Sequence, residues 1–481
     1  MKILIATGEF APLAFAGELG AQVRTLAAEL KKLGHDVSIV IPFYRSVREG
    51  NYDIRPTGVE FQVNLGAKRA ATEIFETLGA DQIQVFLVRR DEYFDRSAIY
   101  SANGRAYEDN AERFIFFSKS VIELGRRLAP SPDIIHAHDW TAALIPVLVK
   151  ERQLPFLTVL SVHDLENQGS FWSFDFALTN LPGSYFGPRG VEFYGRLNFL
   201  KGGILYGDSV TLPGELALYE AFTPEGGHGL HLVLQENASR TTGIPFGTDY
   251  SATNPPFEKL LPKKPKNGPI GSRKTACREA LLKQLELDTS PEGMVLACPI
   301  YPADAKALAG IAPILDLILT GTDRLVIHGD IPESFLASVL AAERKYRDRF
   351  AVVSKDQPKI EQLLLASGDV VLLPSSLGLR GRTAIAALRY GTIPIVRFRG
   401  GLPQIVSDAD PVHETGDGFV YYRESPKALW DTIQRAKWFR ARPAEWQQLV
   451  TRAQSADFSW AESAKAFSKL YANLLRHRQG A

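Results

Sequence analysis

The segment DVVLLPSSLGLRGRTAIAALRYGTIPIV, residues 369–396, decides the fold of the region around it. A short apolar strand, a loop rich in Gly and Ser, a helix and a second apolar strand follow one another, as in a parallel β-α-β unit. The helix of such a unit points free backbone N–H groups beyond the first strand, where they favour an anion such as a phosphate. The loop and first helical turn contain no carboxylate; their small or cationic residues are Gly378, Arg380, Gly381, Arg382 and Thr383.

The same alternation of strands and helices extends outward from this segment. Further apolar strands at 295–298, 324–328 and 350–353 predict a parallel sheet, and the first 41 residues predict another β-α-β unit. Residues 52–90 predict shorter strands, of which 60–64 and 82–88 are the clearest, and the alternation of strands and helices continues to about residue 249. Residues 254–271 hold five prolines and four lysines without periodicity, which predicts an exposed linker. The predicted fold class is therefore α/β, with two doubly wound Rossmann-like domains facing across a cleft. The first predicted domain covers residues 1–250, the linker 251–271, the second domain 272–460 and a C-terminal helix 461–481.

Composition excludes several classes of protein. Lys and Arg total 55 against 54 for Asp and Glu, so no basic surplus favours nucleic acid. Glu9 interrupts the first apolar run too early for a signal peptide, and no run is long enough to span a bilayer. The two cysteines lack the spacing of a metal site and the density of a disulfide framework. We expect a cytoplasmic protein with no membrane or nucleic-acid partner and no metal.

A series of motifs resembles the family of bacterial glycogen synthases and plant starch synthases. The motifs are YFDR (93–96), YEDNAERF (107–114), HAHDWTAALIP (136–146), SVHDLENQG (161–169), LALYEAFTPEGGHGL (216–230), LRYGTIPIV (388–396), RGGL (399–402) and DFSW (457–460). The resemblance covers nearly the whole chain and implies a GT-B fold whose C-terminal helix packs back toward the first domain. It also implies retaining glucosyl transfer from ADP-glucose to the non-reducing end of an α-1,4-glucan, with no metal or other cofactor.

The resemblance places two catalytic positions on residues that the chain keeps. His163 follows a predicted strand and by resemblance contacts the donor sugar; the alternative is a histidine that only caps the strand end. Lys306 keeps the family's lysine at the start of the second domain; the alternative is a solvated lysine before a helix. On the acceptor side, Asp139 and Trp140 are kept.

Other donor positions have lost the residues that the family uses. In the first phosphate loop Gly17 remains, but Phe15 stands for a lysine and Glu18 for a glycine. Tyr301 stands for an arginine, and its single hydroxyl cannot replace a guanidinium fork on a diphosphate. Gly378 stands for the glutamate that faces the donor sugar, and Phe246 stands for an asparagine. Because losing one preorganised donor typically costs ~10²–10³ in rate, we expect weak or no transferase activity.

Three interpretations follow from these substitutions. The first is a pseudoenzyme with a collapsed donor site that binds α-glucan (glycogen) or an active enzyme of glycogen metabolism. The second is an active glycosyltransferase in which Arg380 and Arg382 bind the diphosphate at the helix N-terminus; solvated arginines are the alternative for these two. In the third, Glu18 forms a salt bridge with Arg380 or Arg382 and so occupies the phosphate site.

Overall fold

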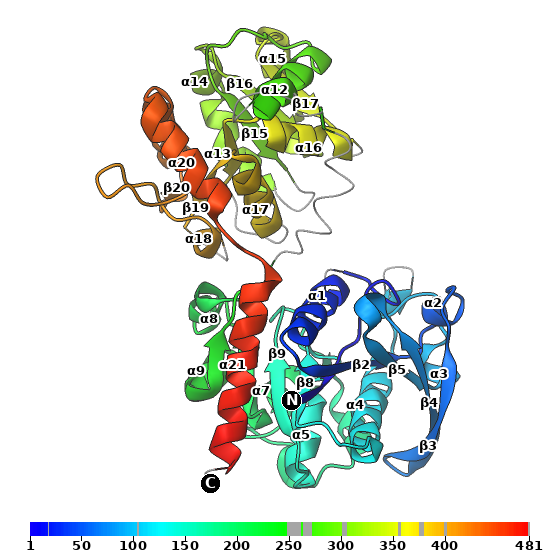
Figure 1. The fold of residues 1–481 in the computed structure, drawn as a ribbon. Helices are drawn as coiled ribbons and strands as arrows, with labels where there is room; N and C mark the ends of the chain where they lie inside the picture. Colours follow the sequence, from blue (N-terminus) through cyan, green and yellow to red (C-terminus); the bar gives the residue numbers. More distant parts are fainter. Residues whose placement is uncertain are drawn as a thin grey trace. The chain divides into compact units, whose positions relative to one another are not determined.

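The computed structural model describes residues 1–17, 19–102, 105–247, 261–262, 272–300, 305–354, 357–374, 380–398 and 402–479. Contacts divide the chain into two compact units, Met1–Gly247 with Trp460–Ala481, and Thr248–Ser459 (Figure 1). The predicted linker lies outside the described residues, apart from 261 and 262. Each unit contains one large sheet, so the prediction of two α/β domains is confirmed.

Nine strands among the described residues form the sheet of the first unit. They are β1 (Lys2–Ala6), β2 (Asp36–Pro42), β3 (Arg55–Leu65), β4 (Lys68–Leu78), β5 (Gln84–Arg89), β8 (Ile134–His138), β9 (Leu157–Ser161), β13 (Ser209–Leu212) and β14 (Thr241–Gly243). Their order is β14-β13-β9-β8-β1-β2-β5-β4-β3. Neighbours from β14 to β5 are parallel, whereas β4 is antiparallel to both β5 and β3.

The order of strands reverses at β1. Ile3 pairs with Val37 of β2 on one side and with Ile134 of β8 on the other. In doubly wound sheets, ligands bind beyond the carboxyl ends of the strands at such a reversal. The loops that follow β1 and β8 are therefore the first place to look for a site.

Helix α1 (Leu19–Lys32) follows the first loop and buries the apolar face that its spacing predicts, including Val23 and Leu30. Gly34 has a φ of +84°, a conformation that favours glycine, and the helix ends before it. The other helices of this part of the unit are α2 (Arg45–Arg48), α3 (Asp91–Phe94), α4 (Asn110–Arg127), α5 (Leu144–Glu151), α6 (Phe176–Thr179), α7 (Phe199–Tyr206), α8 (Glu215–Ala221) and α9 (His231–Glu236).

Two regions of the first unit differ from the sequence prediction. The prediction of shorter strands at 52–90 is wrong for β3 and β4, which have 11 residues each and form a long hairpin, whereas the strand predicted at 82–88 corresponds to β5. Between β9 and α7, where regular alternation was expected, β10 (Ser170–Phe171), β12 (Arg196–Asn198) and β11 (Glu192–Phe193) form a small antiparallel sheet. A further short pair consists of β6 (Ser101–Ala102) and β7 (Arg105–Ala106).

The sheet of the second unit is parallel, with six strands among the described residues in the order β17-β16-β15-β18-β19-β20. They are β15 (Val295–Pro299), β16 (Arg324–His328), β17 (Phe350–Val353), β18 (Val370–Leu373), β19 (Ile393–Arg397) and β20 (Phe419–Tyr421). Alternate residues enter different cores: Leu296 and Cys298 face one, and Val295 and Ala297 face the other. Both faces are thus covered, as expected for parallel strands.

Helices connect these strands on both sides of the sheet (Figure 1). They are α12 (Ser272–Gln284), α13 (Ala305–Ile311), α14 (Leu315–Leu319), α15 (Glu333–Lys345), α16 (Pro358–Ser367), α17 (Arg380–Tyr390), α18 (Leu402–Ile405), α19 (Pro426–Arg440) and α20 (Pro443–Ser455). Leu296 of β15 pairs with Leu325 on one side and Val370 on the other, so the order of strands in this sheet reverses between β15 and β18.

The last helix, α21 (Trp460–Gln479), belongs to the first unit and packs against α1 (Figure 1). Ser463 donates a hydrogen bond of 2.6 Å to the carbonyl of Pro245, and the Ser468 hydroxyl lies 2.8 Å from Nε2 of His35. In the described part of the chain, every helix is too short or too polar to cross a bilayer.

Candidate functional site

The strand reversal in the first sheet brings together the loops after β1, β8 and β9. Gly8 follows β1, and a Cβ atom at this position would lie 2.9 Å from the Tyr100 hydroxyl and 3.0 Å from Thr141. The backbone approaches these side chains so closely that only glycine fits without displacement. His163, two residues beyond the end of β9, lies at the same carboxyl edge of the sheet.

The ring of His163 forms a hydrogen bond through each of its nitrogens. Nε2 lies 2.9 Å from Nδ1 of His138, and Nδ1 lies 2.8 Å from Oε1 of Gln22 on α1. Both contacts are satisfied if His138 donates to Nε2 and His163 donates from Nδ1 to Gln22. The reverse assignment would leave Nε2–H of His138 as a buried donor, since this atom has no partner among the described residues. In the favoured assignment, His163 has no ring nitrogen left for a ligand.

Burial keeps the histidines of this site uncharged. It lowers the pKa of His163 to about 3. It also lowers the pKa of His136 to about 3, with a smaller contribution from His163, and that of His138 well below its usual value. At neutral pH the three imidazoles therefore supply no positive charge to a diphosphate.

An aromatic side chain covers the ring of His163. The Phe246 ring lies 4.4 Å from it, centroid to centroid, at an angle of 36°. Phe246 also stacks on Trp460 at the start of α21, with centroids 5.7 Å apart and planes 19° apart. By resemblance this position belongs to an asparagine, so an apolar ring has replaced a polar side chain beside the predicted catalytic histidine.

A buried chain of hydrogen bonds links α21 to the strands that carry these histidines. The Tyr471 hydroxyl lies 2.8 Å from Nδ1 of His136, and Nε2 of His136 lies 2.7 Å from the Ser161 hydroxyl. Ser161 in turn lies 2.6 Å from the hydroxyl of Thr211. The His136 ring also packs on His138, with centroids 4.1 Å apart. Through Tyr471, helix α21 thereby holds His136 and His138 of β8 in position.

Asp139, a predicted acceptor-side residue, links the loops after β8 and β9. Its Oδ1 accepts the backbone N–H of His163 at 2.7 Å, and its own backbone has a φ of +53°, which is strained for an aspartate. Burial raises the pKa of Asp139 to about 7, although the bond from His163 opposes this shift. This bond fixes the position of His163, whatever further role Asp139 has.

Trp140, the other predicted acceptor-side residue, lies in an aromatic cluster. Its ring packs against Phe114 at 4.8 Å and against Tyr100 and Phe171 at 5.7 Å each. Gly169 has a φ of +61°, and a Cβ atom there would lie 2.9 Å from the Trp140 ring. Packing thus accounts for much of the environment of Trp140.

A buried carboxylate occupies the amides of the first predicted phosphate loop. Oε2 of Glu9 accepts the backbone N–H groups of Ala16 at 2.7 Å and Gly17 at 3.0 Å. Its Oε1 accepts the Tyr100 hydroxyl at 2.9 Å. Those two N–H groups cannot bind a phosphate while Glu9 holds them.

The side chains of the same loop offer no cation to a phosphate. Phe15, at the family's lysine position, is 60% exposed and apolar. Gly17 is exposed and has no atom within 4 Å of a Cβ built on it. Glu18 lies outside the described residues, so the predicted Glu18 salt bridge remains a prediction.

The second unit brings the other predicted donor positions to its own strand reversal. Lys306 is on α13, which follows β15, and Arg380, Gly381, Arg382 and Thr383 form the first turn of α17, which follows β18. Thr383 is buried, and Gly381 approaches Ile405, which lies 3.0 Å from a Cβ built on the glycine. Tyr301, Gly378 and the side chains of Lys306, Arg380 and Arg382 are outside the described part. The backbone therefore places only Lys306 and residues 380–383 at this edge of the sheet.

Sequence reasoning missed four residues of the first site, namely Glu9, Gln22, His138 and Tyr471. His138 could have been found, because it lies two residues after His136 in the HAHDW motif and so on the same face of an extended strand. For the others, no local pattern distinguishes them from ordinary polar residues. No group of three His, Cys, Asp or Glu residues that could hold a metal occurs within the described ranges.

Comparisons with known proteins agree on one family. Residues 2–236 match the starch synthase catalytic domain, and residues 320–447 match the glycosyl transferases of group 1. The chain is 32% identical over 478 residues to glycogen synthase from Geotalea daltonii, with 98% of each chain covered. It is 31% identical over 486 residues to glycogen synthase 2 from Geobacter metallireducens, with 100% of each covered.

Solved structures share the fold. The catalytic domain of starch synthase IV from Arabidopsis thaliana, bound to ADP and acarbose, superimposes with a TM-score of 0.78 at 24% identity. The match covers 98% of this chain and 99% of that one. A sucrose-phosphate synthase from Thermosynechococcus elongatus gives a TM-score of 0.55 at 16% identity, over 99% and 100% of the two chains.

Proposed function

Because the chain belongs to the family of bacterial glycogen synthases and plant starch synthases, we propose that it is a glycogen-synthase-like protein of α-1,4-glucan metabolism with weak or lost transferase activity. Its fold is GT-B, with two Rossmann-like domains. Its role under this proposal is to bind glucan, in place of extending it, and so to regulate glucan metabolism or its enzymes.

The closed set of hydrogen bonds around His163 carries this proposal. Retaining transfer without a metal needs polar and cationic groups that stabilise the leaving diphosphate and an oxocarbenium-like sugar. Both ring nitrogens of His163 instead form hydrogen bonds, one with His138 and one with Gln22, and the Phe246 ring covers the imidazole. A sugar could reach the imidazole only after these contacts break.

The first phosphate loop supports the same conclusion. Glu9 already accepts the N–H groups of Ala16 and Gly17, and Phe15 offers no charge. A diphosphate would have to displace a carboxylate that is itself buried. Together with the sequence changes at Tyr301 and Gly378, this explains why we expect little turnover.

Two exposed aromatic side chains that follow Phe171 offer a surface suited to sugars. Trp172 is 66% exposed and Phe174 is 72% exposed, with ring centroids 4.9 Å apart. They follow Phe171, which packs on Trp140. Exposed aromatic groups of this kind mark ligand surfaces, and the apolar faces of glucose rings stack on them. Both cysteines, Cys277 and Cys298, are buried and are not joined by a disulfide, in keeping with the cytoplasmic location that we assign to this role.

Glycogen co-sedimentation tests the binding role. We expect the protein to sediment with glycogen, and the double variant Trp172→Ala, Phe174→Ala to bind at least tenfold more weakly. Tyr219→Ala is the control, because Tyr219 is 70% exposed on α8 and should leave binding unchanged. Absence of the wild-type protein from the glycogen pellet would refute this role.

One observation favours a second candidate, an active transferase with a remodelled donor site. Helix α17 begins at Arg380, and its first turn contains Arg382 and no acidic residue. Two arginines in the first turn of a helix are residue types that suit a diphosphate. Titration with ADP-, UDP- and GDP-glucose distinguishes the candidates, because an active site of this kind must bind one of them at millimolar concentration or below.

A further inference from the structure

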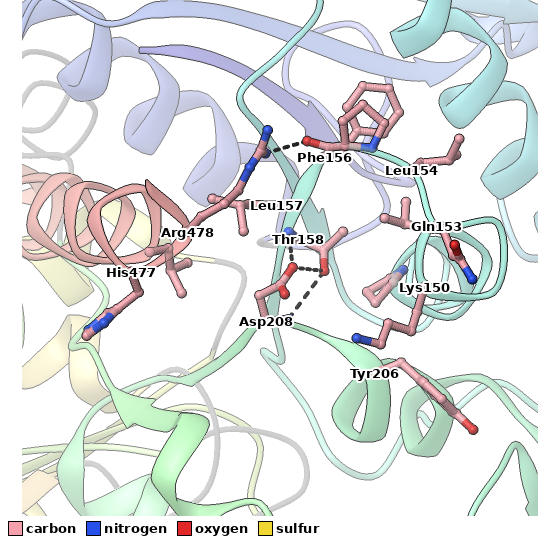
Figure 2. Close-up of a pocket in the computed structure, with 14 residues that line it drawn as sticks. Lys150, Gln153, Leu154, Phe156, Leu157, Thr158, Tyr206, Asp208, His477 and Arg478 are labelled. Atoms are coloured by element: carbon pink, nitrogen blue, oxygen red, sulfur yellow. Dashed lines mark hydrogen bonds between the residues drawn. The ribbon is translucent and has the colours of Figure 1, made fainter. Parts of the chain in front are cut away.

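A pocket of about 830 Å³ lies at the amino ends of β9 and β13 (Figure 2). This is the opposite end of the first sheet from His163, which follows the carboxyl end of β9. Small-molecule sites typically occupy ~300–1,000 Å³. The last turns of α5, α7 and α21 line it, through Lys150, Tyr206 and Arg478. The lining includes neither the predicted donor loops nor the exposed pair Trp172 and Phe174.

The charges around this pocket nearly cancel. Lys150 and Arg478 are cationic, and Asp208 is anionic. The carboxyl ends of three helices also converge here, and each helix end carries ~0.5 of a negative charge at its free carbonyls. The pocket therefore favours neither a strong anion nor a cation, and a neutral ligand suits it best.

Unpaired donors and acceptors stand close together in the pocket. Oδ2 of Asp208 accepts the backbone N–H and the hydroxyl of Thr158 at 2.7 and 2.9 Å, but its Oδ1 has no partner within the described residues. The ammonium group of Lys150 and the side-chain amide of Gln153 likewise have no protein partner in that part of the chain, and all three residues are exposed to solvent. A ligand that replaces water here can both donate and accept hydrogen bonds, as sugar hydroxyls do.

An aromatic ring completes the lining. Tyr206 packs against Tyr185 with centroids 5.3 Å apart and donates its hydroxyl to the carbonyl of Arg189 at 3.1 Å. These contacts hold the ring in place beside the pocket. Across from it, Arg478 donates to the carbonyl of Pro155 and anchors the end of α21 (Figure 2).

We propose that this pocket binds a short segment of neutral α-glucan, with a glucose ring against Tyr206 and hydroxyls on Lys150, Gln153 and Asp208. The chemistry of the lining selects a neutral polyhydroxyl ligand. The choice of α-glucan among such ligands rests on the proposed function. Since α21 forms one wall, an occupied pocket also fastens that helix to the first unit.

Calorimetric titration with maltotetraose tests the proposal. Lys150→Ala removes a charged hydrogen-bond donor, worth ~1.5–3 kcal/mol in general, so affinity should fall at least tenfold. Tyr206→Leu should also weaken binding about tenfold by removing the stacking surface. Tyr206→Phe keeps the ring and should bind like the wild type. Lys469→Ala removes an exposed charge from α21 outside the pocket and should change affinity less than about twofold.

Two results would overturn the proposal. One is equal maltotetraose affinity in Lys150→Ala, Tyr206→Leu and the wild type. The other is stronger binding of glucose 1-phosphate than of maltotetraose with the same dependence on Lys150, which would make the pocket an anion site. If wild-type protein binds no glycogen, the proposed function fails; if it binds glycogen but the pocket variants retain full maltotetraose affinity, only the pocket assignment fails.

Discussion

Replacing Tyr471 with phenylalanine should destabilise the first unit by a predictable amount. The hydroxyl of Tyr471 lies 2.8 Å from Nδ1 of His136, and both residues are fully buried. The change removes this bond and leaves a buried acceptor without a partner, which costs ~1–3 kcal/mol. In a domain of this size, 1 kcal/mol lowers the melting temperature by ~2–4 °C, so the expected decrease is ~2–12 °C.

Thermal unfolding followed by circular dichroism measures this decrease, and Tyr206→Phe is the matched control. Tyr206 is partly exposed, and water can replace its hydroxyl at the Arg189 carbonyl. Its loss should cost within ~0.5 kcal/mol. Equal melting temperatures for the two variants would show that the bond to His136 contributes nothing, and the reasoning about the buried histidine chain would be wrong.

Three further predictions concern pH and the second unit. Burial lowers the pKa of His136 and His163 to about 3, so their stabilising contribution is present above the unfolded pKa and is lost as pH falls from ~6.5 toward 3. In urea unfolding, the free energy of unfolding should decrease by ~1.4 kcal/mol per pH unit for each histidine over this range. A free energy of unfolding that does not change with pH would contradict this. Burial raises the pKa of Asp139 to about 7, so its contribution to stability is present below pH ~4 and is lost as pH rises through 7. Asp139→Asn should therefore be ~1–4 kcal/mol more stable than the wild type at pH 8 in the same assay. Equal or lower stability of Asp139→Asn would count against the raised pKa of Asp139. Arg324→Met removes the bonds that its buried guanidinium donates to the carbonyls of Asp288 and Ser290 and to the Asp288 carboxylate, which keeps its bonds from Ser290. It should destabilise the second unit by ~1–3 kcal/mol in thermal unfolding, whereas Arg344→Met, on an exposed face of α15, should have no effect.

The sequence predicted strands best where both faces of a sheet are covered. The predicted strands at 324–328 and 350–353 have the same bounds as β16 and β17, because such strands read as continuous apolar runs. The hairpin of β3 and β4 was misjudged, since its exposed face interrupts the apolar pattern with polar residues. The small sheet before α7 consists of strands of two or three residues, too short to produce any periodicity.

The site was predictable only where a motif marked it. His163 and Asp139 were identified by resemblance, and the structure brings them into contact through a hydrogen bond. Gln22 and Glu9 were not predicted, because their roles depend on which loops meet at the strand reversal between β1 and β8. Tyr471 reaches His136 from a helix at the far end of the sequence, and tertiary packing alone brings them together.

Glucosyl transfer from ADP-glucose to glycogen is the most direct measurement of the central claim that the donor site has collapsed. We expect a rate at least ~10² below that of an ordinary glycogen synthase, because several donor contacts are missing. Lys306→Ala is the control and should leave this residual rate unchanged. An ordinary synthase rate that is lost in Lys306→Ala would contradict the claim and show that the donor site works.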